Sequence, residues 1–164
     1  MSETIQLRPY QQNAIDALRQ ALKEGYNRPV LQAPTGAGKT VIAAAIVNMA
    51  RQRGKRVIFA VPFLSLINQT VERFLQNGIF DVGVMQGMHG LTNPNMPVQV
   101  CSVQTLARRE IPKSDLVIVD ECQNVSNKQT EMIIGRLGIN SKMIFCGDTS
   151  QIDLKSKKES GIGV

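Results

Sequence analysis

The chain has 164 residues, of which 43% are hydrophobic but only 4% aromatic, and it contains no Trp. This length suffices for one domain with a sizeable core, which must be built mainly from aliphatic residues. The formal net charge of +6 favours a polyanionic partner, either nucleic acid or a nucleotide, although a protein can also simply be basic. We expect residues 1–164 to form a single domain, with about 155–164 as a frayed polar tail.

Several classes of protein are disfavoured by particular residues. Cys101, Cys122 and Cys146 are far apart and odd in number, so we expect buried free thiols rather than a disulfide framework. With His89 as the single histidine, a zinc site is not expected either. The longest apolar stretch, residues 41–47, is too short to cross a bilayer, and the N-terminus lacks a signal pattern. We therefore expect a cytoplasmic protein with no membrane partner.

The spacing of apolar residues predicts a regular alternation of strands and helices. In chain order we expect a helix over 9–24, a strand over 29–33, a helix over 39–52, a strand over 56–61, a helix over 64–75, strands over 81–85 and 98–102, a helix over 103–109, a strand over 116–119, a helix over 128–137 and a strand over 142–146. This order predicts an α/β fold, with a parallel sheet sandwiched between helices.

A glycine-rich segment joins the first predicted strand to the following helix, and this context is typical of a P-loop. The segment reads Ala33, Pro34, Thr35, Gly36, Ala37, Gly38, Lys39 and Thr40, with Ala33 in place of the usual first glycine. Residues 34–38 are expected to cradle the phosphates of ATP, because the glycines let the backbone curl so that consecutive N–H groups face them. Lys39 is expected to reach the β- and γ-phosphates, and Thr40 to offer its hydroxyl to Mg²⁺.

Two acidic residues, Asp120 and Glu121, follow the buried strand predicted over 116–119. Ligands of open α/β sheets bind at the carboxyl ends of the strands, so these carboxylates should lie beside the P-loop. Asp120 is expected to hold Mg²⁺ through water, and Glu121 to orient and deprotonate the attacking water.

Gln151 follows the last predicted strand, whose tip should also face the nucleotide. Gln151 could sense the γ-phosphate and report its hydrolysis. The alternative is a polar turn in which Asp148 begins an Asx-turn.

These motifs resemble those of superfamily 2 helicases and translocases. The segment 7–11 resembles the Q-motif, and by that resemblance Gln11 recognises adenine and Arg8 lies near the base. Residues 33–40 match motif I, and residues 120–123 match motif II of the DEAD/DEAH type, with Gln123 in place of the last Asp or His. The resemblance covers about residues 5–123 and implies a RecA-like fold with the first motor domain of a helicase.

The resemblance also implies contacts with the backbone of single- or double-stranded nucleic acid. Residues 57–70 and 98–109 look like motifs Ia and Ib, and the candidate contact residues are Ser65, Thr105, Arg108 and Arg109. A helicase motor needs a second RecA-like domain, which 164 residues cannot also contain. Because that partner supplies the arginine finger, we expect ATP binding, feeble hydrolysis and no unwinding by this chain alone.

The last quarter of the chain departs from the superfamily 2 pattern. Residues 120–124 and 141–154, with the later Ser160 and Gly161, resemble PhoH-like ATPases instead. Two origins are open: a natural divergent protein, or a recombined or engineered chimera joined near residue 120. Two further functions also stay open: a PhoH-like ATPase, and a non-catalytic nucleotide-binding scaffold.

Overall fold

The computed structural model describes residues 5–34, 36–137 and 141–148. Its elements follow the expected order. They are α1 (Pro9–Lys23), β1 (Val30–Gln32), α2 (Lys39–Gln52), β2 (Val57–Val61), α3 (Ser65–Gln76), β3 (Val82–Val84), β4 (Val98–Ser102), α4 (Val103–Arg108), β5 (Leu116–Val119), the 3-10 helix η1 (Cys122–Asn124), α5 (Asn127–Arg136) and β6 (Lys142–Gly147).

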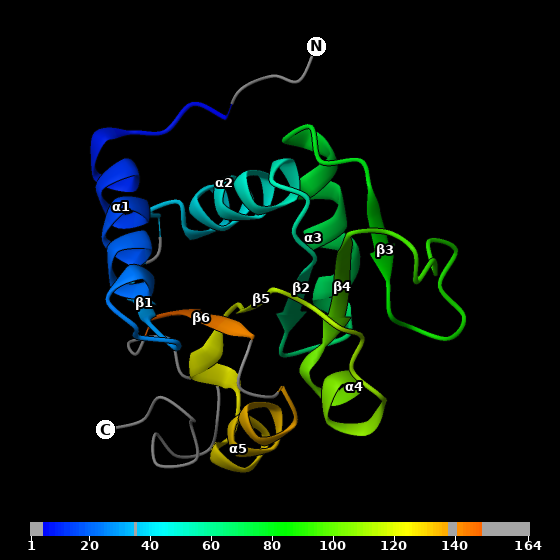
Figure 1. The fold of residues 1–164 in the computed structure, drawn as a ribbon. Coiled ribbons are helices and arrows are strands. Elements are labelled where there is room, and N and C mark those ends of the chain that lie inside the picture. Colours follow the sequence, from blue (N-terminus) through cyan, green and yellow to red (C-terminus); the bar gives the residue numbers. More distant parts are fainter. Residues whose placement is uncertain (1–4, 35, 138–140, 149–164) are drawn as a thin grey trace.

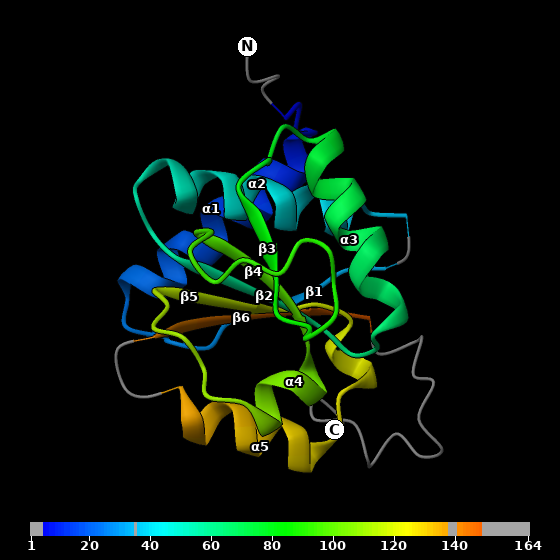
Figure 2. The same cartoon turned by 90° about the vertical axis from the view of Figure 1, so that its right-hand side faces the viewer.

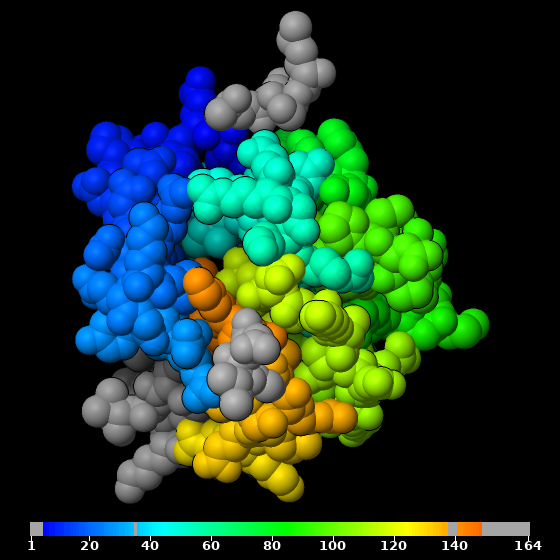
Figure 3. Space-filling model, viewed as in Figure 1, coloured from blue at the N-terminus to red at the C-terminus, as the bar shows by residue number. Residues whose placement is uncertain are grey.

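The strands form one six-stranded sheet in the order β1-β6-β5-β2-β4-β3, and every pairing in it is parallel. Segments far apart in the sequence therefore become neighbours, and Figure 1 shows β6 beside β1. The space-filling view likewise shows orange residues of the last strand against blue residues that follow α1 (Figure 3). All six carboxyl ends point to the same edge, because the pairing is parallel throughout.

Helices cover both faces of the sheet, as Figure 2 shows with α1, α2 and α3 on one side and α4 and α5 on the other. The buried strand β2 explains this arrangement from its sequence. Val57, Phe59 and Val61 pack in the core cluster that includes α1–α3, whereas Ile58 and Ala60 pack in the cluster that includes α4 and α5. A continuous apolar run is thus what a strand covered on both faces requires.

The predicted α/β fold with a parallel sheet between helices is confirmed. The helices and strands begin and end within one residue of the predicted bounds, and η1 is the element that the apolar pattern did not indicate. All three cysteines are free and buried, as expected. The predicted tail, about 155–164, lies outside the described residues, and the single-domain organisation over 1–164 stays a prediction. In the described part of the chain, no helix combines the length and the apolar character needed to cross a membrane.

Candidate functional site

The loop between β1 and α2 turns sharply before the helix begins. Gly36 and Gly38 have φ values of 84° and 76°, a left-handed backbone that residues with a Cβ rarely adopt. The N–H of Ala33 donates to the carbonyl oxygen of Gly147 at 3.2 Å, which fixes the start of the loop to the end of β6. The loop therefore curls at the N-terminus of α2, where the first N–H groups of a helix and the helix dipole favour an anion.

The two polar side chains at the start of α2 make defined contacts. The Lys39 Nζ donates to the carbonyl oxygen of Ala33 at 2.8 Å, so the ammonium lies across the loop that contains it. The Thr40 Oγ1 accepts a hydrogen bond of 3.0 Å from Nη1 of Arg73, which belongs to α3. Both residues are thus held at the mouth of the loop.

The first turn of α1 is joined to the same loop through Gln11, which is only 5% exposed. Its Oε1 accepts from the N–H of Arg8 at 2.9 Å, and its Nε2 donates to the carbonyl oxygen of Ala37 at 3.1 Å. The hydroxyl of Tyr10 donates to the same carbonyl at 2.9 Å. A Cβ at Gly38 would overlap the Gln11 amide, so this close approach requires glycine. The adenine-binding roles of Gln11 and Arg8 stay predictions.

Asp120 and Glu121 follow β5 at the same edge of the sheet. The N–H of Asp120 donates to the carbonyl oxygen of Ala60 at 2.9 Å, so the β5–β2 pairing continues to the acidic pair. Glu121 has a φ of 46°, and no other described residue besides glycine has a positive φ. This conformation costs a non-glycine residue about 1–2 kcal/mol, and such strain tends to occur at functional sites.

The electrostatics of Asp120 suit a cation site. Burial raises the pKa of Asp120 from its ordinary 3.8 to about 6, while the positive charges of Lys39 and Arg73 lower it. The structure thus brings Lys39 and Asp120 close enough to interact, although they are 81 positions apart in the sequence. A buried carboxylate is costly without a cation, so the site favours an additional positive charge.

The tip of β6 is joined to the segment after Asp120 by Gln123. The Oε1 of Gln123 accepts from the N–H of Asp148 at 3.1 Å, and both residues are buried. A Cβ at Gly147 would lie 2.6 Å from this oxygen, so the strand end and η1 are tightly packed. Of the predicted site residues, Thr35 and Gln151 lie outside the described part of the chain, and their roles stay predictions.

The residues at this edge fit a magnesium–nucleotide complex. A hydroxyl, Thr40, and a carboxylate, Asp120, are the hard oxygen ligands that Mg²⁺ prefers. The left-handed loop supplies backbone N–H groups at a helix N-terminus, and Lys39 supplies a fixed ammonium beside them. When bound, Mg²⁺ would neutralise phosphate charge, while the chain's own residues would hold the phosphates and orient water.

The segments that resemble motifs Ia and Ib also begin side by side. Val61 at the end of β2 pairs with Ser102 at the end of β4. Ser65 begins α3 with an exposed side chain, whereas the Thr105 hydroxyl lies 3.0 Å from the Ser102 hydroxyl. The structure therefore leaves Ser65 open to a partner and engages Thr105 in a helix cap. Arg108 and Arg109, at and just after the end of α4, are exposed.

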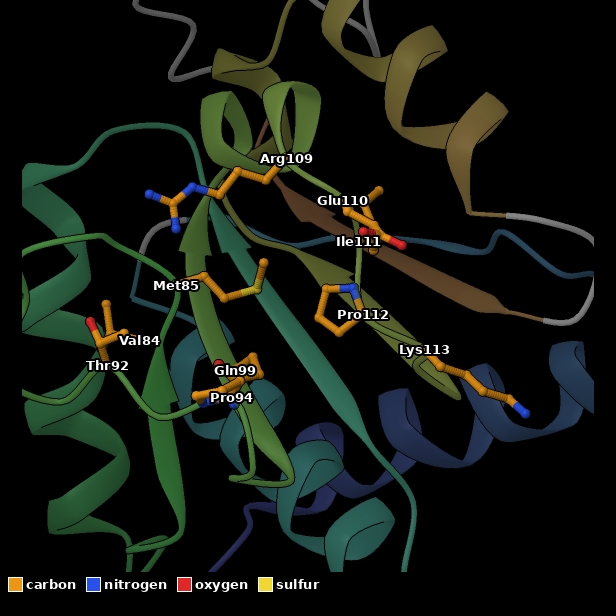
Figure 4. A pocket seen from close by; sticks show the side chains of 10 residues that line it. All are labelled: Val84, Met85, Thr92, Pro94, Gln99, Arg109, Glu110, Ile111, Pro112 and Lys113. Carbon is orange, nitrogen blue, oxygen red and sulfur yellow. The ribbon is translucent and has the colours of Figure 1, made fainter.

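A separate cavity of about 500 Å³ lies between β3, β4 and the segment after α4 (Figure 4). Figure 4 shows Arg109 at one end of it and Lys113 at the other, with Met85 and Pro112 between them. The cavity shares no lining residue with the loop or the acidic pair. Arg109 thus borders this hollow as well as the exposed end of α4.

Three residues at this edge had no predicted contact there. Arg73 bonds to Thr40 from 33 positions away, and no sequence pattern connects the two. Tyr10 stands inside the Q-motif segment, which could have drawn attention to its hydroxyl. Gln123 departs from the motif II pattern, but its bond to the end of β6 depends on strand order.

The fold and the family match together define a RecA-like ATPase domain of the superfamily 2 helicase and restriction-enzyme class. The chain belongs to the family described as type III restriction enzyme, res subunit, whose family model matches residues 4–146. Proteins of this family are ATP hydrolases, and in general they use ATP with Mg²⁺.

Similar proteins include helicases and PhoH-like proteins. A PhoH-like protein of Synechocystis is 29% identical over 146 residues, which cover 80% of this chain and 44% of that protein. The UvsW helicase of bacteriophage T4 has a TM-score of 0.70 at 24% identity, and the match covers 95% of this chain and 57% of the UvsW chain. The SWI2/SNF2 ATPase core of Sulfolobus solfataricus, in complex with dsDNA, has a TM-score of 0.71 at 21% identity. The match covers 96% of this chain and 35% of the Sulfolobus chain. The chain spans less than half the length of the first curated relatives it matches.

Proposed function

We propose that this chain is the first motor domain of a nucleic-acid helicase or translocase, acting in the cytoplasm. The observation that carries the proposal is the meeting of Lys39, Thr40 and Asp120 at one edge of the sheet. An ammonium, a hydroxyl and a buried carboxylate at a helix N-terminus have the chemistry that a magnesium–triphosphate requires.

Each predicted site residue has a part in this proposal. Residues 34–38 cradle the phosphates, Lys39 binds the β- and γ-phosphates, and Thr40 and Asp120 hold Mg²⁺. Glu121 orients the attacking water and accepts its proton as the water oxygen bonds to the γ-phosphorus. The bond between that phosphorus and the β–γ bridging oxygen breaks, and ADP is the leaving group. The left-handed backbone of Glu121 supports this assignment, because strain of this kind tends to be kept at functional sites.

Two other parts of the nucleotide site are proposed on different grounds. Gln11, with Arg8 beside it, recognises adenine, and the bonds from Gln11 to the phosphate loop support a link between base and phosphates. Gln151 senses the γ-phosphate; it follows β6, whose tip lies between the loop and the acidic pair.

The nucleic-acid partner is proposed to bind through its backbone, at the edge that also holds the nucleotide. Ser65, Arg108 and Arg109 are exposed beside the ends of β2 and β4, and Thr105 lies near them. Contacts with phosphates alone are independent of sequence and weaken steeply as salt rises. The Sulfolobus SWI2/SNF2 core, which shares the fold, is in complex with dsDNA.

A second RecA-like domain is proposed to complete the motor. The chain covers 57% of the T4 UvsW chain and 35% of the Sulfolobus SWI2/SNF2 core, so both of those chains extend beyond the part that this domain matches. An arginine finger supplied from outside can contribute about 10³–10⁵ in rate. We therefore expect feeble hydrolysis and no strand separation by residues 1–164 alone.

Phosphate release measured with and without single-stranded DNA, double-stranded DNA and RNA tests this function. The unaltered chain should release phosphate slowly, and nucleic acid should raise the rate. Lys39→Ala should abolish binding of Mg²⁺–ATP, whereas Glu121→Gln should retain binding and lose hydrolysis. An unaltered chain that binds no adenine nucleotide would refute the proposal, and efficient strand separation by this chain would refute the need for a second domain.

A PhoH-like ATPase is the second candidate, favoured by the Synechocystis relative. Self-association of the purified chain in solution would support it. A non-catalytic scaffold, natural or engineered, is the third, and then Glu121→Gln should change no measured property. A chimeric junction near residue 120 stays a hypothesis, and the family match over residues 4–146 runs across it.

A further inference from the structure

Arg73 has a fixed backbone and an exposed side chain. Its neighbours in α3, Val71 and Phe74, are 5% and 0% exposed, and both pack in the core. The Phe74 ring also meets Phe59 edge to face, with ring centroids 5.0 Å apart. The helix is therefore held firmly on either side of Arg73, while the long side chain can change rotamer without disturbing the core.

The Arg73 guanidinium lies at the predicted magnesium site. Its Nη1 donates to Thr40 Oγ1 at 3.0 Å. Thr40 directly follows Lys39 at the start of α2, so the guanidinium and the ammonium lie at the mouth of the same loop. Arg73 is thus a second cation at the loop, in addition to Lys39, and it comes from a different element of the fold.

The contact between Arg73 and Thr40 conflicts with the proposed role of Thr40. A magnesium ion held by Thr40 would bind the oxygen of its hydroxyl. The same oxygen now accepts from the guanidinium, so the ion and Arg73 would be cations sharing one neutral ligand. Their repulsion would drive Arg73 from Thr40, and the guanidinium would then need an anionic acceptor within reach of its side chain.

We propose that Arg73 is a phosphate-binding residue that moves from the Thr40 hydroxyl to the terminal phosphate of ATP and so distinguishes ATP from ADP. This inference rests on the proposed nucleotide-binding function. The γ-phosphate is the acceptor that fits, because Thr40 and Asp120 would hold a magnesium ion whose charge draws the terminal phosphate to the same edge of the sheet. A guanidinium, with its planar fork of donors, binds such a group more specifically than an ammonium does.

A purely structural role predicts something different. If Arg73 only braces α3 against the start of α2, its loss should lower thermal stability and weaken ATP and ADP equally. If Arg73 binds the terminal phosphate, its loss should weaken ATP alone, because ADP lacks that group. The ratio of the two affinities therefore separates the two roles, and it needs no measurement of hydrolysis.

The test is calorimetric titration of the chain with Mg²⁺ and either ADP or the β,γ-imido analogue of ATP. Arg73→Gln should weaken the ATP analogue by about ten-fold or more, the loss expected for a charge-assisted hydrogen bond. It should leave ADP within about two-fold of the unaltered chain. Arg73→Lys should fall between the two, since it keeps the charge but loses the fork. Arg53→Gln is the matched control, because this exposed arginine caps the opposite end of α2.

The outcomes separate this inference from the function it rests on. Equal losses for both nucleotides, or no loss for either, would overturn the role of Arg73 while the nucleotide site stands. Loss of the ATP analogue's affinity in Arg53→Gln as well would also overturn it, because general charge would then be the cause. An unaltered chain that binds neither nucleotide overturns the proposed function and this inference with it.

Discussion

Replacing Asp120 with Asn should stabilise the protein in a buffer that contains a metal chelator. Burial is the largest influence on the Asp120 carboxyl, and it raises the pKa from 3.8 to about 6. Each unit of pKa corresponds to about 1.4 kcal/mol, so the ionised carboxylate lowers the free energy of unfolding by up to about 3 kcal/mol at pH 7.5. Asn has the same shape without the charge, and its oxygen can still accept the backbone hydrogen bond from Glu121.

The sign of the pH dependence follows from the raised pKa. Between about pH 4 and pH 6 the folded protein binds more protons at Asp120 than the unfolded chain does. The contribution of Asp120 to the free energy of unfolding therefore falls as pH rises through this window. The advantage of Asp120→Asn should accordingly shrink from about 3 kcal/mol at pH 7.5 to about 1 kcal/mol at pH 4.5.

Urea unfolding of the two proteins at both pH values measures this difference. Asp16→Asn makes the same chemical change at an exposed position of α1, and it should shift the free energy of unfolding by no more than about 0.5 kcal/mol. With Mg²⁺ and ATP present, the order should reverse, because Asn cannot supply the negative charge that the cation requires. An Asp120→Asn protein that gains nothing at pH 7.5, or gains equally at both pH values, would refute the reasoning.

Three further substitutions test the packing around the site. Gly38→Ala should lower the free energy of unfolding by about 1–2 kcal/mol through the left-handed backbone alone. The overlap of the added Cβ with the Gln11 amide should increase that cost. Phe74→Ala should cost about 3–5 kcal/mol, since it empties a fully buried position and removes the ring contact with Phe59. Ser126→Ala should cost about 1 kcal/mol, because the Ser126 hydroxyl caps α5. Urea unfolding at neutral pH measures all three.

Matched variants give each of these predictions a comparison. Gly54→Ala has a similar left-handed backbone, with a φ of 72°, but meets no atom within 4 Å, so it should cost less than Gly38→Ala. Phe80→Ala removes a ring that is 69% exposed and should change stability little. Ser126→Asn keeps a good cap and should stay near the unaltered chain. Equal losses in the free energy of unfolding within either the glycine or the phenylalanine pair would contradict the corresponding argument. So would a Ser126→Asn protein that loses as much as Ser126→Ala.

Much of the fold could be predicted because the decisive signals are local. The continuous apolar runs of β2 and β5 indicate strands covered on both faces, and the helical spacing in 9–24 and 64–75 indicates α1 and α3. The left-handed loop before α2 is likewise encoded by adjacent residues, since a strand, Gly36, Gly38 and a helix follow one another directly. Such features depend on neighbours in the chain, so one sequence suffices to find them.

The sequence by itself thus determined the α/β alternation, the loop that begins α2 and the acidic pair after β5. Only the tertiary structure decided which side chains share the edge, because strand order brings β6 between β1 and β5 and places Arg73 against Thr40. Contacts between residues dozens of positions apart depend on how whole elements pack, and no local pattern of residues specifies them.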